Sequence, residues 1–146
     1  MIENIGNIAF MVGGAISMFG ALIHWVAPIL GVDYYASLGS PRWVVESARN
    51  HTWPAPVGAL VIGNLMFACA LYAMAGMGYA IPYLPLVKMA IVTIATLGIV
   101  RGMAVIPILI RAPRMFTPFH VIAAVVWFVA GLGFAVGGYQ NWALIA

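Results

Sequence analysis

Four long runs of apolar residues, separated by short polar stretches, dominate the chain. They extend over roughly residues 8–30, 54–75, 86–110 and 119–138. A helix needs ~20 predominantly apolar residues to cross the hydrocarbon core of a bilayer, and each run reaches that length. Short links between such helices favour antiparallel neighbours. The pattern therefore predicts an all-α integral membrane protein, an up-down four-transmembrane-helix bundle that forms a single membrane domain.

The link between the first two runs is longer and more polar than the others. Ser40 and Pro41 are typical of a helix N-cap followed by proline at the first helical position, and charged residues then recur at helical spacing. We expect a short amphipathic helix over about 41–50 that lies in the membrane interface, the alternative being an ordinary solvated loop. Its charged residues are Arg42, Glu46 and Arg49.

The composition supports lipid as the solvent. The chain is 65% hydrophobic and 6% charged, whereas soluble domains carry ~25% charged residues. Its mean hydropathy is +1.09. The net charge of +3 is too sparse for a nucleic-acid footprint, so we expect membrane lipid, other membrane subunits or a second copy of the chain as partners.

The basic residues predict an orientation. Lys and Arg in short loops favour the cytoplasmic side. Lys88 alone belongs to the side that also holds both termini, which are therefore predicted to be non-cytoplasmic. The loops on the other side carry Arg42, Arg49, Arg111 and Arg114.

Small residues recur four apart in two of the runs. Gly13, Ser17 and Ala21 do so in the first run, and Gly133 and Gly137 in the fourth. Small residues at this spacing let helix backbones approach closely in lipid. We interpret them as helix-packing positions.

Arg101 lies inside the third run and is the most informative residue. An arginine near the middle of a bilayer costs at least ~2.5–3.5 kcal/mol, so it is a functional site by default or an interhelical clamp. At a rise of 1.5 Å per residue, Asn64 and His24 fall in the same half of the membrane as Arg101. Glu46 is the only acid placed to reach Arg101 as a counter-ion. Gly98 and Gly102 leave room beside Arg101 for a neighbouring helix or a ligand.

This one-sided cluster favours a non-catalytic protein that binds the polar head of a lipid or other amphipathic ligand in a half-membrane pocket around Arg101. Each residue also has a structural interpretation: Arg101 as a clamp, Asn64 as an interhelical bond, His24 as a hydrogen-bonded interior histidine. The predicted ligand-binding residues are Arg101, Asn64, His24, Arg42, Glu46 and Arg49.

Two other functions stay open. The chain can be an accessory subunit of a larger membrane complex, in which Arg101 and the glycine-rich faces meet a partner. It can also be a membrane enzyme on a lipidic substrate, with His24 or His51 as acid–base and Arg101 as electrostatic stabiliser.

No resident cofactor or metal is expected. The chain has three acidic residues, Glu3, Asp33 and Glu46, and none lies in a predicted span, whereas zinc and di-iron sites need several acidic, histidine or thiolate ligands. Haem b between His24 and His120 is the less favoured alternative, because their estimated depths differ by ~6 Å.

A succession of short motifs runs from about Ser40 to Arg101. They are Pro41-Arg42-Trp43, Trp53-Pro54-Ala55, Leu71-Tyr72-Ala73 with Gly76, Leu84-Pro85-Leu86 and Arg101-Gly102. In these motifs the chain resembles a group of small, largely uncharacterised bacterial inner-membrane proteins with four predicted helices. The resemblance implies a four-helix fold and a bacterial inner-membrane location, and no activity.

Overall fold

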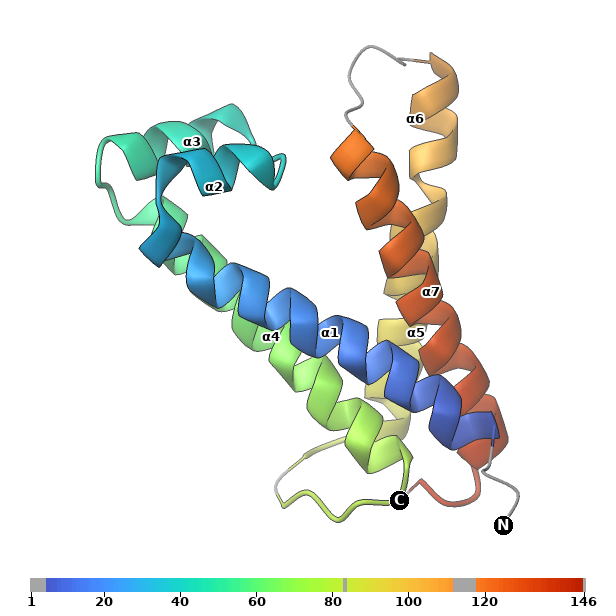
Figure 1. The fold of residues 1–146 in the computed structure, drawn as a ribbon. Coiled ribbons are helices and arrows are strands. Elements are labelled where there is room, and N and C mark those ends of the chain that lie inside the picture. Colours follow the sequence, from blue (N-terminus) through green and yellow to red (C-terminus); the bar gives the residue numbers. More distant parts are fainter. Residues whose placement is uncertain (1–4, 83, 112–117, 146) are drawn as a thin grey trace.

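The computed structural model describes residues 5–82, 84–111 and 118–145, and all their regular secondary structure is helical (Figure 1). Arg114, one of the loop arginines used to predict the orientation, lies outside the described residues. The helices are α1 (Ile5–Leu30), α2 (Val32–Ser37), α3 (Arg42–Arg49), α4 (Pro54–Gly76), α5 (Val87–Met103), α6 (Val105–Arg111) and α7 (Pro118–Asn141).

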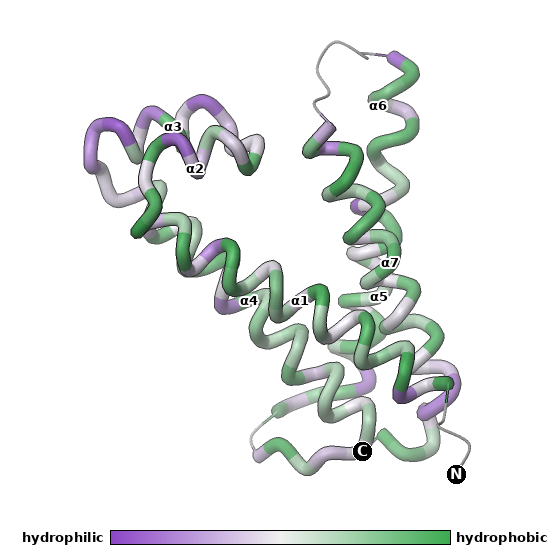
Figure 2. Tube along the Cα trace, in the orientation of Figure 1, coloured by the Kyte–Doolittle hydropathy of each residue, from purple (hydrophilic) through white to green (hydrophobic). Residues whose placement is uncertain are grey.

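Four helical segments are long and apolar enough to cross a membrane: α1, α4, α5 with α6, and α7. They coincide with the four apolar runs, so the predicted all-α, four-helix membrane fold is confirmed. Figure 2 shows that these segments are mainly hydrophobic, and that polar residues gather in α2 and α3.

The four segments form two antiparallel pairs, α1 with α4 and α5 with α7, and the pairs meet chiefly where α1 packs on α7 (Figure 1). Close approaches between α1 and α7 join Ala9 and Gly13 to Gly133 and Phe134. They involve the first half of α1 and the second half of α7. The pairs therefore cross near the end that holds both termini, the terminal end, and diverge toward the end that carries α2 and α3, the α2–α3 end.

Glycines let the helices of these contacts touch backbone to backbone. A Cβ atom added to Gly131 of α7 would lie 2.6 Å from the backbone nitrogen of Ile99 on α5, and one on Gly98 would lie 2.8 Å from the Cα of Gly131. One on Gly102 would lie 2.8 Å from the carbonyl oxygen of Ala124. The space beside Gly98 and Gly102 is thus filled by α7 and not by a ligand.

The predicted small-residue packing positions are also confirmed. Gly13, Ser17, Ala21, Gly133 and Gly137 are all buried. The Ser17 hydroxyl donates to the carbonyl of Gly13 in its own helix at 2.9 Å, so it leaves no unpaired polar group in the contact.

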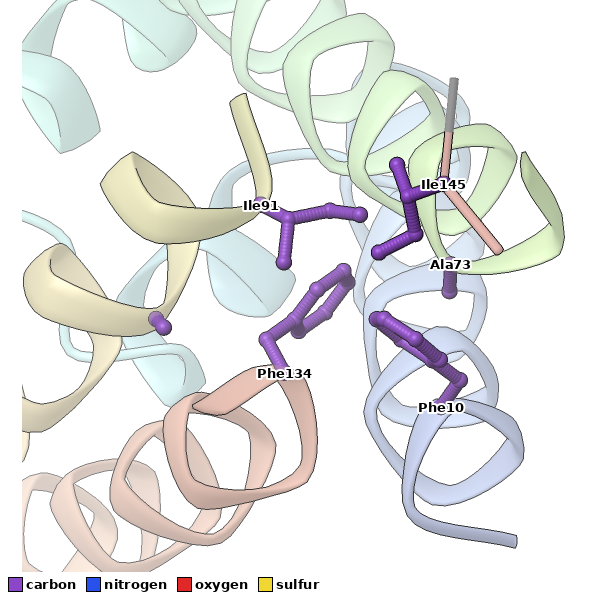
Figure 3. Packing of buried hydrophobic residues seen from close by; sticks show 6 residues of the cluster. Phe10, Ala73, Ile91, Phe134 and Ile145 are labelled. Atoms are coloured by element: carbon purple, nitrogen blue, oxygen red, sulfur yellow. The ribbon is translucent and has the colours of Figure 1, made fainter. Parts of the chain in front are cut away.

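The main core lies at the terminal end (Figure 3). Phe10 of α1 and Phe134 of α7 meet edge to face, with ring centroids 5.9 Å apart. Asn141 at the end of α7 is 0% exposed. Its side-chain amide donates to the Asn7 side-chain oxygen at 2.7 Å and to the Gly76 carbonyl at 3.0 Å. A buried polar side chain thereby joins α7 to both α1 and α4.

The third span departs from the predicted continuous helix. Ala104 forms a turn between α5 and α6. Pro107 is three residues further along and has no N–H to donate to the carbonyl of Met103, against which its ring also clashes. The break is the local response of the helix to this proline.

The first link contains two helices where one was predicted. The predicted helix is present as α3, but Ser40 does not cap it: Pro41 occupies the N-cap with an extended backbone (ψ 148°) and no side-chain hydrogen bond. The hydroxyl of Ser47 instead accepts from the backbone N–H of Ala55 at 2.9 Å and joins α3 to α4. The interfacial position of α3 stays a prediction.

Candidate functional site

The helix faces that form the core carry mainly polar residues two turns further along, toward the α2–α3 end. Residues seven apart lie on nearly the same face of a helix, ~10.5 Å along its axis. At the core level these faces carry Phe10, Ala73, Phe134 and the partly buried Ile94. Seven residues toward the α2–α3 end, they carry Ser17, Met66, Trp127 and Arg101.

A second step of seven residues reaches His24 on α1 and His120 on α7. The faces of α1, α5 and α7 thus change from apolar at the terminal end to polar toward the α2–α3 end, whereas that of α4 stays apolar, with Met66 and then Ala59. We call Ser17, His24, Arg101, His120 and Trp127 the inner polar stripe. These residues lie on the parts of α1, α5 and α7 that extend from the core toward the α2–α3 end.

Arg101 is exposed, although Ile94, two turns earlier on the same face of α5, packs against the core. Ten residues separate it from Arg111 at the end of α6, which is ~15 Å of helix and about half of a bilayer core. Within the described parts of the chain, its guanidinium has no hydrogen-bond or ion-pair partner. The structure therefore does not use Arg101 as a clamp between its own helices.

His24 presents one ring nitrogen toward its own helix. Its Nδ1 lies 2.8 Å from the carbonyl oxygen of Gly20. Because a carbonyl can only accept, Nδ1 carries the proton in this contact. In the neutral ring, Nε2 is then the hydrogen-bond acceptor that points away from α1.

Asn64 is not brought to the face that Arg101 occupies. Its side-chain oxygen accepts from the indole N–H of Trp25 at 3.1 Å, and Trp25 packs against Phe67 with ring centroids 5.5 Å apart. Asn64 is two residues from Met66 and so lies ~160° away from the inner face of α4. It serves as an interhelical bond between α1 and α4, the structural interpretation considered for it.

The charged residues of α3, Arg42, Glu46 and Arg49, are all exposed. Among the described residues, Glu46 forms no ion pair with Arg101 or with any other cation. The expected counter-ion contact between Glu46 and Arg101 is therefore not part of this structure.

The turn between α2 and α3 bridges the diverging pairs. A Cβ added to Gly39 would lie 2.9 Å from the ring of Phe119 and 3.4 Å from that of His120, both in the first turn of α7. Because this segment is connected to α1 and α4, the approach at Gly39 links them to the other pair. The segment covers the α2–α3 end of the inner polar stripe.

Tyr35 of α2 is a polar residue that the sequence analysis did not single out. It is 4% exposed and packs with Ala27, Ala55 and Ala59. Its hydroxyl is the one buried side-chain polar atom without a hydrogen-bond partner in the described structure. Burial raises the pKa of this hydroxyl above its ordinary value. No sequence signal marks it, because a tyrosine in a link is ordinarily exposed.

The described residues contain no group of three or more His, Cys, Asp or Glu side chains that could hold a metal ion. The contacts between Gly6 and Asn141 and between Gly13 and Ala130 set the register of α1 against α7. His24 and His120 lie beyond these contacts, where the helices diverge, so the depth difference estimated from the sequence stays a prediction.

Comparisons with protein-family models, with curated proteins and with solved structures gave no match to this chain. We therefore propose a function from the residues of the inner polar stripe alone.

Proposed function

We propose that the protein is a non-catalytic membrane protein that binds the anionic head of an amphipathic lipid at Arg101. The observation that carries this proposal is the exposed guanidinium halfway along the third span, which has no partner among the residues that the structure describes. A charge at such a depth requires compensation. An anionic headgroup supplies it, since a guanidinium donates two parallel hydrogen bonds to one phosphate or carboxylate.

The composition of the chain favours a lipid over a second copy as the source of the anion. The acidic residues are Glu3, Asp33 and Glu46, and all lie outside the four candidate spans. A homodimer therefore has no carboxylate within its spans to pair with Arg101.

The remaining polar groups fit subsidiary roles. His24 Nε2, on the inner polar stripe, can accept a hydrogen bond from a headgroup hydroxyl or amine. Arg42 and Arg49 are exposed on α3, and cations near the surface attract anionic lipid with ~1 kcal/mol each. Asn64 and Glu46 are not part of the proposed binding site, because the Asn64 side chain is hydrogen-bonded to Trp25 and the Glu46 carboxylate would repel an anion.

The enzyme and the accessory-subunit alternatives each require a different group beside Arg101. An enzyme needs a proton-transfer group beside Arg101, yet the Arg101 side chain has no hydrogen-bond partner within the described residues. An accessory subunit would use Arg101 to meet an acidic side chain of another polypeptide. That polypeptide would accompany the protein when it is extracted from native membranes.

Native mass spectrometry of the protein in nanodiscs of mixed phosphatidylglycerol and phosphatidylcholine tests the proposal. We expect wild-type protein to retain an anionic lipid that Arg101→Gln loses. Arg111→Gln is the matched control, since Arg111 is exposed at the end of the same span, and it should retain that lipid.

Three results would contradict the proposal. Equal retention by Arg101→Gln and Arg111→Gln would show that the lipid is held elsewhere. Release of a second polypeptide from native membranes would favour the accessory subunit. An adduct of porphyrin mass with a Soret absorption band would favour haem between His24 and His120.

A further inference from the structure

A groove lies between α5 and α7, on the flank of α5 opposite Arg101. Its volume is about 490 Å³, which is within the ~300–1,000 Å³ range of small-molecule sites. Ile99 lines it, and Arg101, two residues on, lies ~160° around the same helix. The groove is lined by Ile91, Val92, Ala95, Thr96, Ile99, Phe134, Ala135, Gly138, Tyr139 and Trp142.

The walls of the groove are apolar along most of its length. Thr96 contributes a hydroxyl, but this hydroxyl donates to the carbonyl of Val92 in its own helix at 2.8 Å. No hydrogen-bond donor of Thr96 is left for a polar occupant. An apolar chain is thus the occupant that the walls match.

A cation stands at the terminal end of the groove. The Lys88 ammonium lies 5.6 Å from the ring centroid of Trp142, one of the lining residues. Lys88 is the second residue of α5, so it lies at the edge of the span, where headgroups are located. Tyr139, also lining the groove, is 82% exposed, and such aromatic residues are typical of the membrane–water interface. Lys88 forms no ion pair within the described residues.

We propose that this groove is a binding site for an anionic phospholipid of the leaflet at the terminal end. One acyl chain lies along α5 and α7, and the phosphate binds the Lys88 ammonium beside Trp142. The charge of Lys88 selects the anionic headgroup, and the apolar walls match the chain. This site is separate from Arg101, being at the other end of the membrane and on the other flank of α5.

Two pairs of variants test the site by the retention of phosphatidylglycerol over phosphatidylcholine in nanodiscs of equal acyl length. We expect Lys88→Gln to lower this preference about fivefold, the factor that corresponds to ~1 kcal/mol for one cation at an anionic surface. Its control is Arg111→Gln, at the opposite end of the same span, which should retain the preference.

Filling the groove should displace the acyl chain itself. Thr96→Phe places a ring on a lining position, and we expect it to remove one retained lipid of either headgroup. Val100→Phe is the control, because Val100 is exposed on the same helix and does not line the groove. Neither variant disturbs the α5–α7 contact glycines.

The proposal is overturned if Lys88→Gln keeps the wild-type preference, or if Thr96→Phe and Val100→Phe retain the same number of lipids. Including Arg101→Gln separates the two sites. If Arg101→Gln loses a lipid while Lys88→Gln and Thr96→Phe lose none, lipid binds at the inner polar stripe and the groove proposal is contradicted. If Lys88→Gln and Thr96→Phe lose a lipid while Arg101→Gln loses none, the groove is supported and the function proposed for Arg101 is not.

Discussion

Asn141 and Arg101 show two ways in which a polar side chain is accommodated among apolar helices. Asn141 is fully buried and its amide donates to Asn7 and Gly76. Arg101 is exposed and has no partner within the described chain. The first arrangement stabilises the bundle, and the second leaves a charge for a ligand.

Replacing Asn141 by leucine should lower the free energy of unfolding by ~1–3 kcal/mol, because the buried Gly76 carbonyl and the part-buried Asn7 side-chain oxygen lose their donor. Thermal melting of the purified protein in detergent measures this. Gln140→Leu, at an exposed neighbouring position, should have little effect. Equal melting temperatures for the two variants would show that the Asn141 hydrogen bonds contribute nothing.

The residues of the candidate site were predictable from the sequence only in part. Arg101 is evident because a charge interrupts an apolar run. The partners of Asn64 and Asn141 were not, since Asn141 and Asn7 are 134 residues apart in the chain and their contact depends on how the helices pair. The Tyr35 hydroxyl has no hydrogen-bond partner among the described residues, and this too depends on the fold of a link that has no periodic pattern.

At the level of the helices, apolar run length determines where the spans lie, and the described boundaries agree with it to within a few residues. The short α2 and the turn at Ala104 were missed. A six-residue helix is too short for a periodic signal, and the turn depends on how the helix accommodates Pro107. Pairing of the helices depends on glycines such as Gly98 and Gly131, whose partners are not apparent from spacing alone.

Two Gly→Ala substitutions should have opposite effects on stability. Gly131→Ala places a Cβ against the backbone of α5, and we expect a loss of ~1–3 kcal/mol from overpacking. A Cβ on Gly58 of α4 meets nothing within 4 Å, so Gly58→Ala should stabilise its helix by up to ~1 kcal/mol. Thermal melting in one detergent measures both. A Gly131→Ala protein as stable as the wild type would contradict the close α5–α7 contact.

At the scale of the whole molecule, the two helix pairs join at the terminal end and diverge toward α2 and α3 (Figure 1). The apolar core fills the joined end (Figure 3). The same helix faces present polar residues where the pairs separate. The divergence is what leaves Arg101 exposed, and spans identified one at a time from the sequence contain no information about it.

The central claim is that Arg101 serves an external anion and not the bundle itself. The most direct test is the melting temperature in neutral detergent with and without added phosphatidylglycerol. Lys88→Gln protein is compared with the Arg101→Gln/Lys88→Gln double variant, so that the groove contributes to neither. Without lipid, we expect the double variant to melt no lower than the single one, because Arg101 has no partner to lose among the described residues.

Lipid should stabilise the Lys88→Gln protein by ~2.7 kcal/mol at one hundred times its dissociation constant, and the double variant should lose this gain. A double variant that melts lower without lipid and gains as much from it would contradict the claim. Arg101 would then be a structural residue of the bundle.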